Sequence, residues 1–331
     1  MKKLMKNKKL LIAVTIVLLL VLAGIIAYAV IADRAGNVEN AGSSDHAKRE
    51  VTYLEHDGAK YKLKRNIDTL LILGTDNYLG DNEENGWFYN YDQADFFVVL
   101  VLDNENETVS AIQLNRDTIC EVPWLDVIGQ VGGTVTEHLA LAHTYGSGGA
   151  DSCENTVNAV EMLIYNAPID NYVAFTMDAV PIVNDMVGGV TVTVETDMTA
   201  TDSTLVKGET VTLMGQHALN FARARMALGD EDNEARLSRQ KQYLESFIAQ
   251  ARKAMEEDGT IGLKIFNDCA EYITTDYTAT QFSDITQKLD KYEYTGMVTP
   301  GGIDKMGEQF NEFYVDDSLL WAAVKNAFCR Q

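Results

Sequence analysis

The longest apolar run of the chain lies near its N-terminus, at residues 10–32. At about 1.5 Å per residue, a helix of this length crosses the roughly 30 Å hydrocarbon core of a bilayer. Five lysines precede the run and hold the short end in the cytoplasm, so the rest of the chain is expected outside. They are Lys2, Lys3, Lys6, Lys8 and Lys9.

This pattern predicts a cytoplasmic tail at residues 1–9 and an uncleaved transmembrane anchor at 10–32. The protein is then a single-pass protein of the cell membrane whose main part is extracytoplasmic. A cleaved signal peptide is the alternative, but the run is longer than a typical signal-peptide core. Gly24 and Ala27 also give only a weak cleavage site.

Beyond the anchor, residues 33–65 read as a polar tether and lead-in, and ordered elements follow them. Short apolar runs bounded by turn residues predict strands at 68–74, 96–102, 108–114, 171–175 and 190–194. Helical spacing of apolar positions predicts helices at 156–165, 178–186, 214–222 and 234–253. Buried strands mixed with helices indicate an α/β fold, a layered α-β-α domain with a central mixed β-sheet.

The main domain is expected to span residues 66–255. An acidic turn at 256–259 marks its end, and residues 256–331 are expected to form an ancillary region that packs on it. The formal net charge of −22 argues against nucleic acid or an anionic membrane surface as a partner, because both attract basic patches.

Four cysteines occur after the anchor, and their spacing does not suggest a zinc site. They are Cys120, Cys153, Cys269 and Cys329. An extracytoplasmic location permits disulfides, but the sequence does not choose among the pairings. Isolated buried thiols are the equal alternative.

Two aspartates stand at the ends of neighbouring predicted strands. Asp76 follows Gly74-Thr75 at the end of one strand, and Asp95 opens the next. Carboxylates, together with waters and phosphate oxygens, suit Mg²⁺, so the pair predicts a metal site at which Mn²⁺ is a substitute. An Asx-turn or a helix cap is the alternative for Asp76.

Further polar groups follow the next strand. Arg116 and Asp117 form either a structural ion pair or a phosphate donor held by its neighbour, and both interpretations stay open. His143 and Tyr145 precede a glycine-rich stretch at 146–149, where glycine allows a ligand to approach the backbone. Its N–H groups are expected to be available ahead of the following helix, and a flexible turn is the alternative.

The strongest chemical signal is a cluster of arginines in an acidic chain. Arg223 and Arg225 follow an apolar helix, and in extended backbone their spacing would point both the same way. Arg236, Arg239 and Gln240 share one helix face, opposite an apolar stripe of the same helix. Guanidinium groups match phosphate oxygens two at a time, so the cluster predicts a bound polyanion such as pyrophosphate. A solvated helix paired with the acidic loop before it is the alternative.

Taken in this order, the motifs resemble those of the LytR-CpsA-Psr family of cell-wall ligases. The similar segments are Gly74-Thr75-Asp76, Ala94-Asp95, Asn115 to Thr118, Ala142 to Tyr145, Val187 to Val190, Gly215 to Arg225, and Arg236 to Gln240. Asn115 stands where the family has Pro, and Ala142 where it has Asn. The loop at 78–92 is also longer than usual. None of these departures removes a charged residue of the expected site.

The resemblance implies a transferase that takes a glycopolymer, such as teichoic acid or a capsular polysaccharide, from an undecaprenyl-pyrophosphate carrier. It joins the polymer to a peptidoglycan hydroxyl through a phosphodiester. Asp76 and Asp95 would hold Mg²⁺, and Asp95 and Arg116 would lie closest to the reacting phosphorus. The residues expected to bind pyrophosphate are Arg116, Arg223, Arg225, Arg236 and Gln240. Further substrate contacts are expected from Asp117, His143, Tyr145 and Arg239.

The resemblance also implies an apolar groove beneath the sheet that would hold the polyprenyl chain. Two other functions stay open on the sequence: a lipid-pyrophosphate hydrolase, and a membrane-anchored protein that binds lipid-linked glycan without catalysis. The two aspartates argue against the second, because arginines alone suffice to bind an anion. The chain has no Gly-x-Ser-x-Gly segment and no P-loop, which weighs against an esterase and an NTPase.

Overall fold

The computed structural model describes residues 51–76, 92–126, 128–223, 233–308 and 310–330. The predicted tail and anchor, and most of the tether, lie outside these ranges. Within them, no helix combines the length and the apolar character that a membrane crossing requires.

A six-stranded mixed sheet forms the centre of the domain, in the order β11-β8-β3-β4-β5-β12. The strands are β3 (Ile67–Thr75), β4 (Ala94–Asp103), β5 (Thr108–Leu114), β8 (Asn171–Thr176), β11 (Ile273–Thr275) and β12 (Glu293–Val298). Strands β3, β4 and β5 pair antiparallel, whereas β8 pairs parallel to β3 and β12 pairs parallel to β5. The strands predicted at 68–74, 96–102 and 108–114 are thereby confirmed.

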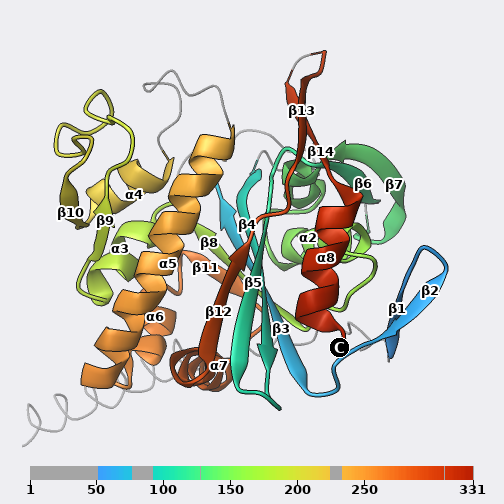
Figure 1. The fold of residues 1–331 in the computed structure, drawn as a ribbon, viewed down its shortest axis with the longest axis horizontal. Coiled ribbons are helices and arrows are strands. Elements are labelled where there is room, and N and C mark those ends of the chain that lie inside the picture. The colour runs from blue at the N-terminus through green and yellow to red at the C-terminus, as the bar shows by residue number, and fades with distance from the viewer. Residues whose placement is uncertain (1–50, 77–91, 127, 224–232, 309, 331) are drawn as a thin grey trace, which may run out of the picture. The chain divides into compact units, whose positions relative to one another are not determined.

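Helices cover both faces of the sheet, so both faces are buried. Successive residues of each central strand point to opposite sides and therefore enter two different cores. Leu71 and Leu73 pack into the core on one face, whereas Leu70 and Ile72 pack on the other. Three helical segments cover the first face: η1 (Leu139–Tyr145), α2 (Ala150–Leu163) and α8 (Asp317–Phe328). Four helices cover the second: α3 (Ala179–Met186), α5 (Asn233–Glu257), α6 (Ile261–Asp268) and α7 (Ala279–Lys291). The predicted α-β-α layering is confirmed (Figure 1).

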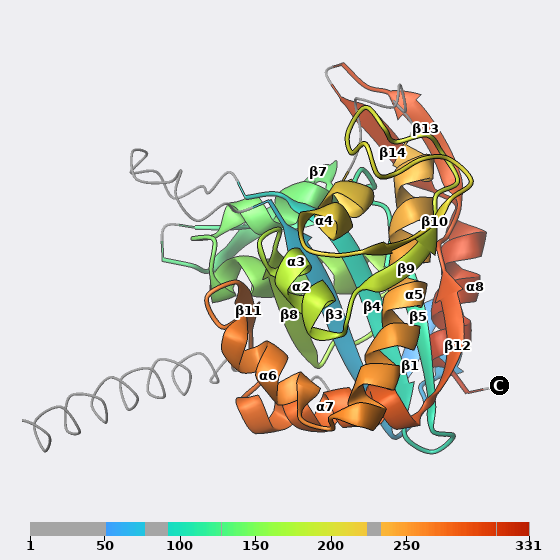
Figure 2. The same ribbon diagram turned by 90° about the vertical axis from the view of Figure 1, so that its left-hand side faces the viewer.

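A third, smaller core lies beside α5 and contains Val190, Val192 and Phe221. It is built on β9 (Val190–Thr193), β10 (Thr210–Leu213) and α4 (Gln216–Arg223). Figure 2 shows α4 near one end of α5, with α6 and α7 near the other. Three further hairpins are β1 (Tyr53–His56) with β2 (Ala59–Lys62), β6 (Ile119–Leu125) with β7 (Val131–His138), and β13 (Gly302–Met306) with β14 (Asn311–Val315).

The C-terminal residues complete the sheet. Both edge strands, β11 and β12, come from the part of the chain after residue 256. Leu320 and Trp321 of α8 belong to the same core as Leu71 and Leu73. The boundary expected after residue 255 falls within the last turn of α5.

Candidate active site

The two aspartates predicted to bind metal lie where two adjacent strands end and begin: Asp76 directly follows β3, and a β-bulge at the start of β4 presents Asp95. Thr75 pairs with Ala94 and Gly74 pairs with Phe96, so Asp95 is the extra residue between the two pairs. A bulge of this kind turns a side chain away from the regular pleat. The backbone N–H of Asp76 donates to the carbonyl of Gln93, with 3.1 Å between the nitrogen and the oxygen. The end of β3 and the start of β4 therefore bring both carboxylates to one corner of the sheet.

Arg116 follows β5 and joins this corner. Its Nη1 forms an ion pair with Oδ1 of Asp95, and its Nε donates to Oδ1 of Asp117 at 3.1 Å. Its Nη2 donates to Oε1 of Gln93 at 2.6 Å. The side chains of Arg116, Asp95 and Asp117 are only 13–14% exposed, so water screens these contacts little. The guanidinium plane is therefore held by groups on two separate segments.

The segment that carries Arg116 is a tight turn. The side-chain oxygen of Asn115 accepts the backbone N–H of Asp117 at 2.9 Å, and the hydroxyl of Thr118 donates to the Asn115 carbonyl at 2.6 Å. Asn115 stands where the family has proline, and its Asx-turn holds this turn by hydrogen bonds instead of by a ring. Hydrogen bonding within the turn thus fixes the direction in which Arg116 leaves the sheet.

The arginines of α5 are buried at the same edge of the sheet. Arg236 is 3% exposed and Arg239 is 7% exposed. The carbonyl of Leu237 accepts a hydrogen bond from Nε2 of Gln113 on β5 at 3.4 Å, which holds the N-terminal part of α5 at the end of that strand. The solvated alternative is therefore wrong for both arginines. The expectation that the arginines lie on the face of α5 opposite its apolar stripe is also wrong in this turn. Leu237, which belongs to the stripe, is buried together with Arg236 and Arg239.

The other members of the predicted cluster differ in how far the structure describes them. The side-chain oxygen Oε1 of Gln240 is buried and has no hydrogen-bond partner within the described part of the chain. Arg223 is exposed and is the last residue of α4. Its backbone is helical, so the expectation that Arg223 and Arg225 point the same way from an extended segment does not hold. Arg225 lies outside the described residues.

His143 is an interior residue. Its Nδ1 lies 2.9 Å from the carbonyl oxygen of Asp92, and its Nε2 lies 3.7 Å from the sulfur of Cys153. Burial lowers the pKa of His143, although the Asp92 carbonyl raises it, so the ring is neutral at pH 7. These contacts place His143 against the segment that leads to Asp95, and its expected contact with substrate stays a prediction. Tyr145 packs partly buried against the core.

The glycine-rich stretch before α2 is tied to the first turn of that helix by hydrogen bonds. The N–H of Gly148 donates to the hydroxyl of Ser152 at 2.9 Å, and the N–H of Ser147 donates to the carboxylate of Asp151 at 2.9 Å. The N–H groups of Ser147 and Gly148 are therefore not available for a ligand. Gly146 is required for packing, because a Cβ there would lie 2.4 Å from the hydroxyl oxygen of Ser152.

The four cysteines are separate buried thiols. Burial raises the pKa of Cys120 to about 12, and that of Cys153 still further, so neither is a thiolate at neutral pH. Of the two alternatives left open by the sequence, the structure therefore contains isolated thiols. They are inert groups of the core.

Asp76 and Asp95 fit a hard cation by their chemistry. Both are carboxylates, both are partly buried, and they lie at one corner of the sheet. Across the described ranges, no three His, Cys, Asp or Glu side chains gather into a ready-made cage. An ion held by these two residues would therefore take its remaining ligands from water and substrate, which is how proteins commonly hold Mg²⁺.

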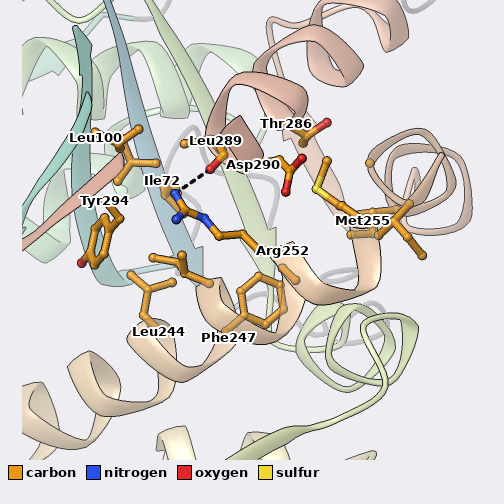
Figure 3. A pocket seen from close by; sticks show the side chains of 16 residues that line it. Ile72, Leu100, Leu244, Phe247, Arg252, Met255, Thr286, Leu289, Asp290 and Tyr294 are labelled. Carbon is orange, nitrogen blue, oxygen red and sulfur yellow. Dashed lines mark hydrogen bonds between the residues drawn. The ribbon is translucent and has the colours of Figure 1, made fainter. Parts of the chain in front are cut away.

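An apolar cavity of about 160 Å³ lies under α5, on the face of the sheet that carries α6 and α7. Ile72, Leu100 and Val109 form its floor on the sheet, and Leu244 and Phe247 form its wall on α5. Figure 3 shows Ile72, Leu100, Leu244 and Phe247 around the cavity, with Arg252 reaching across it. One helix therefore runs from the buried arginines at its start to an apolar cavity near its end.

A domain with buried arginines at one edge of its sheet and an apolar cavity beneath it suits, by its chemistry, an anionic amphiphile. The sequence profile of the LytR_cpsA_psr family matches residues 29–315, so the chain belongs to this family. The resemblance found in the motifs is thereby confirmed.

The chain is similar to proteins named polyisoprenyl-teichoic acid–peptidoglycan teichoic acid transferases. It is 26% identical to TagV of Bacillus subtilis strain 168 over 255 residues, covering 75% of this chain and 58% of TagV. It is 29% identical to TagU of Halalkalibacterium halodurans over 159 residues, covering 48% of this chain and 47% of TagU. The chain thus spans about half the length of the curated relatives it matches.

Solved structures share the fold. A structure described as TagT bound to LIIa-WTA has a TM-score of 0.61 at 19% identity and covers 80% of this chain and 90% of that chain. The crystal structure of TagV from B. subtilis has a TM-score of 0.59 at 23% identity and covers 80% of this chain and 96% of that chain. At these identities the likeness concerns the fold alone.

Proposed function

We propose that the protein is a phosphotransferase that moves a wall glycopolymer from an undecaprenyl-pyrophosphate carrier to a hydroxyl of peptidoglycan. The observation that carries the proposal is the course of α5. Its first turns hold the buried Arg236 and Arg239, and its later turns line an apolar cavity. A ligand with an anionic head and a long apolar tail matches both ends. The names of the relatives support a teichoic acid or a similar wall polymer as the cargo.

The reaction is a displacement at phosphorus. The acceptor hydroxyl oxygen bonds to the phosphorus nearest the sugar, the bridging bond from that phosphorus to oxygen breaks, and polyprenyl phosphate leaves. We assign Asp95 as the group that receives the proton of the hydroxyl. We assign Arg116 to neutralise the charge on the phosphate oxygens, because phosphoryl transfer depends on positioning and charge stabilisation.

Arg223, Arg225, Arg236 and Gln240 are proposed to bind the pyrophosphate. Asp76 and Asp95 are proposed to hold Mg²⁺, or Mn²⁺ as a substitute. The bound ion supplies further neutralisation of phosphate charge. Contacts to Gln93 and Asp117 keep Arg116 in one orientation, so little reorganisation accompanies the reaction.

The proposal includes the location. Residues 10–32 are proposed to anchor the chain in the cell membrane, with residues 1–9 in the cytoplasm and the catalytic domain outside. A tethered domain meets a membrane-bound carrier at a raised effective concentration. Peptidoglycan lies on the same side of the membrane.

The test uses the full chain in lipid vesicles with a labelled lipid-linked glycopolymer, peptidoglycan fragments and Mg²⁺. Wild type is compared with Arg116→Ala and Asp95→Asn, and with Lys60→Ala as a control at an exposed ion pair. We expect label on peptidoglycan with wild type and the control, and at least about 100-fold slower transfer by the two site variants.

Other results would assign a different function. Free phosphorylated glycan without an adduct would indicate a hydrolase. Tight binding of the lipid-linked glycan without turnover would indicate a binding protein. Equal transfer by Arg116→Ala and wild type would remove Arg116 from the site.

A further inference from the structure

One charged side chain crosses the apolar cavity. Arg252, near the end of α5, extends from the helix toward Ile72 and Leu289 (Figure 3). On one side of it lie Leu100, Leu244, Ile72 and Tyr294, and on the other lie Met255, Thr286 and Asp290. Arg252 therefore lies between a mostly apolar group of side chains and a group that includes the polar Thr286 and Asp290.

Arg252 is fastened to the helix on the far side of the cavity. Its Nη2 donates to the carbonyl of Leu289 at 3.0 Å and to the carbonyl of Tyr292 at 2.5 Å, at the C-terminal end of α7. Free carbonyls and the negative end of the helix dipole favour a cation there. The guanidinium thus bridges α5 and α7 across the space that a ligand tail would enter.

This arrangement leaves part of the side chain unsatisfied. Nε of Arg252 is buried and has no hydrogen-bond partner among the described residues. A buried donor without a partner is unfavourable, and more so when it belongs to a charged group in apolar surroundings. Methionine, which occurs at position 255 of the same cavity, would fill comparable space without that cost. A role other than filling the cavity would account for an arginine here.

The distance from the site to Arg252 can be worked out along the helix. Arg239 and Arg252 are separated by 13 positions on α5, which corresponds to about 20 Å at 1.5 Å per residue. Leu244, Phe247 and Ile248 line the cavity between them. A lipid with its phosphates at the arginines and its tail under α5 would meet the Arg252 bridge after about this length.

We propose that Arg252 ends the compartment that holds the lipid tail and thereby sets the length of prenyl chain that the protein can bury. The inference rests on the proposed function, because it takes the cavity as the site of the carrier's tail. Arg252 is a specificity-determining residue in this account and takes no part in the transfer itself.

The test measures binding against chain length. The full chain in lipid nanodiscs is titrated with farnesyl, solanesyl and undecaprenyl phosphate, each competing with a fluorescent prenyl phosphate. Wild type is compared with Arg252→Met and with Lys253→Met, which removes an exposed cation from the next position of the same helix. All proteins are measured in the same nanodiscs, so that the partition of each lipid into the bilayer cancels in the comparison.

We expect the affinity of wild type and of Lys253→Met to be the same for solanesyl and undecaprenyl phosphate, because both tails are longer than the compartment of about 20 Å. In Arg252→Met it should continue to rise, by about tenfold, because the tail buries further apolar groups beyond the former bridge. Chain-length profiles of Arg252→Met and wild type that coincide would overturn the inference and leave the proposed function standing. Wild type that binds none of the three lipids would overturn both. If Arg252→Met does not fold, Arg252→Gln, which shortens the bridge but keeps a hydrogen-bond donor, is judged by the same comparison.

Discussion

Replacing Arg116 by lysine should weaken the fold as well as the activity. The guanidinium reaches three acceptors in three directions: Asp95, Asp117 and the side-chain oxygen of Gln93. A lysine ammonium has a single nitrogen and cannot replace all three contacts, so at least one acceptor loses its partner. A largely buried acceptor without a partner costs about 1–3 kcal/mol. The side chains are still 13–14% exposed, so water partly screens the loss. We therefore expect Arg116→Lys to lower the free energy of unfolding by about 1–2 kcal/mol.

Arg116→Ala should cost more than Arg116→Lys. It leaves the carboxylates of Asp95 and Asp117 without their shared cation, and removing one partner of a largely buried pair costs about 3 kcal/mol. The assay is urea unfolding of the full chain at pH 7, followed by tryptophan fluorescence. Lys60→Ala is the control, because the side chains of Lys60 and Glu55 are each 60% exposed, and it should leave stability unchanged. If Arg116→Lys and Arg116→Ala were both as stable as the control, the three contacts would contribute nothing and the reasoning would be refuted.

Three further predictions concern the backbone, the pH and the metal. Gly189 has a φ of +84°, and a Cβ there would lie 2.3 Å from the sulfur of Met214, so Gly189→Ala should cost about 2–4 kcal/mol in urea unfolding. Burial raises the pKa of Asp202, but hydrogen bonds from Asn220 and Thr204 outweigh it, and the folded-state pKa lies below the ordinary 3.8. The ionised Asp202 therefore stabilises the fold above about pH 4, and this contribution is lost as the pH falls further. The free energy of unfolding of Asp202→Asn should consequently change less with pH below about 4 than that of wild type. Urea unfolding curves at several pH values measure this difference. Chelation of divalent ions should stop transfer, and added Mg²⁺ should restore it; full activity in the chelator would rule out the metal proposal.

The apolar pattern predicted the central elements because burial alone determines them. Strands β3, β4 and β5 are apolar on both faces, and their predicted ranges agree with the observed ones to within two residues at each end. The helix predicted from Thr156 instead begins at Ala150, because its first turns bury polar residues such as Ser152 and Asn155, which an apolar pattern does not detect. Asn155, for example, donates to the carbonyls of Pro123 and Ala142, which no local pattern reveals.

The candidate site likewise contains residues that the sequence predicts and residues that it does not. Asp76, Asp95 and Arg116 were predictable, because each stands next to a strand end and strand ends meet at one edge of a sheet. The burial of Arg236 was not, because it depends on β5 packing against α5, far apart in the sequence. Arg252 gave no signal, since a single cation near the end of a helix is ordinary. Only the carbonyls of α7 and the cavity wall make it distinctive.

The proposed reaction is a displacement at the phosphorus nearest the sugar, so it can be tested by following that phosphorus. A lipid-linked glycopolymer with a radioactive label on the sugar-proximal phosphorus would be incubated with the full chain, Mg²⁺ and peptidoglycan. We expect the label to move into peptidoglycan with the glycan, and unlabelled polyprenyl phosphate to be released. Label that stays with the lipid while the glycan reaches peptidoglycan would show that a sugar–oxygen bond breaks instead, and would contradict the phosphotransferase proposal.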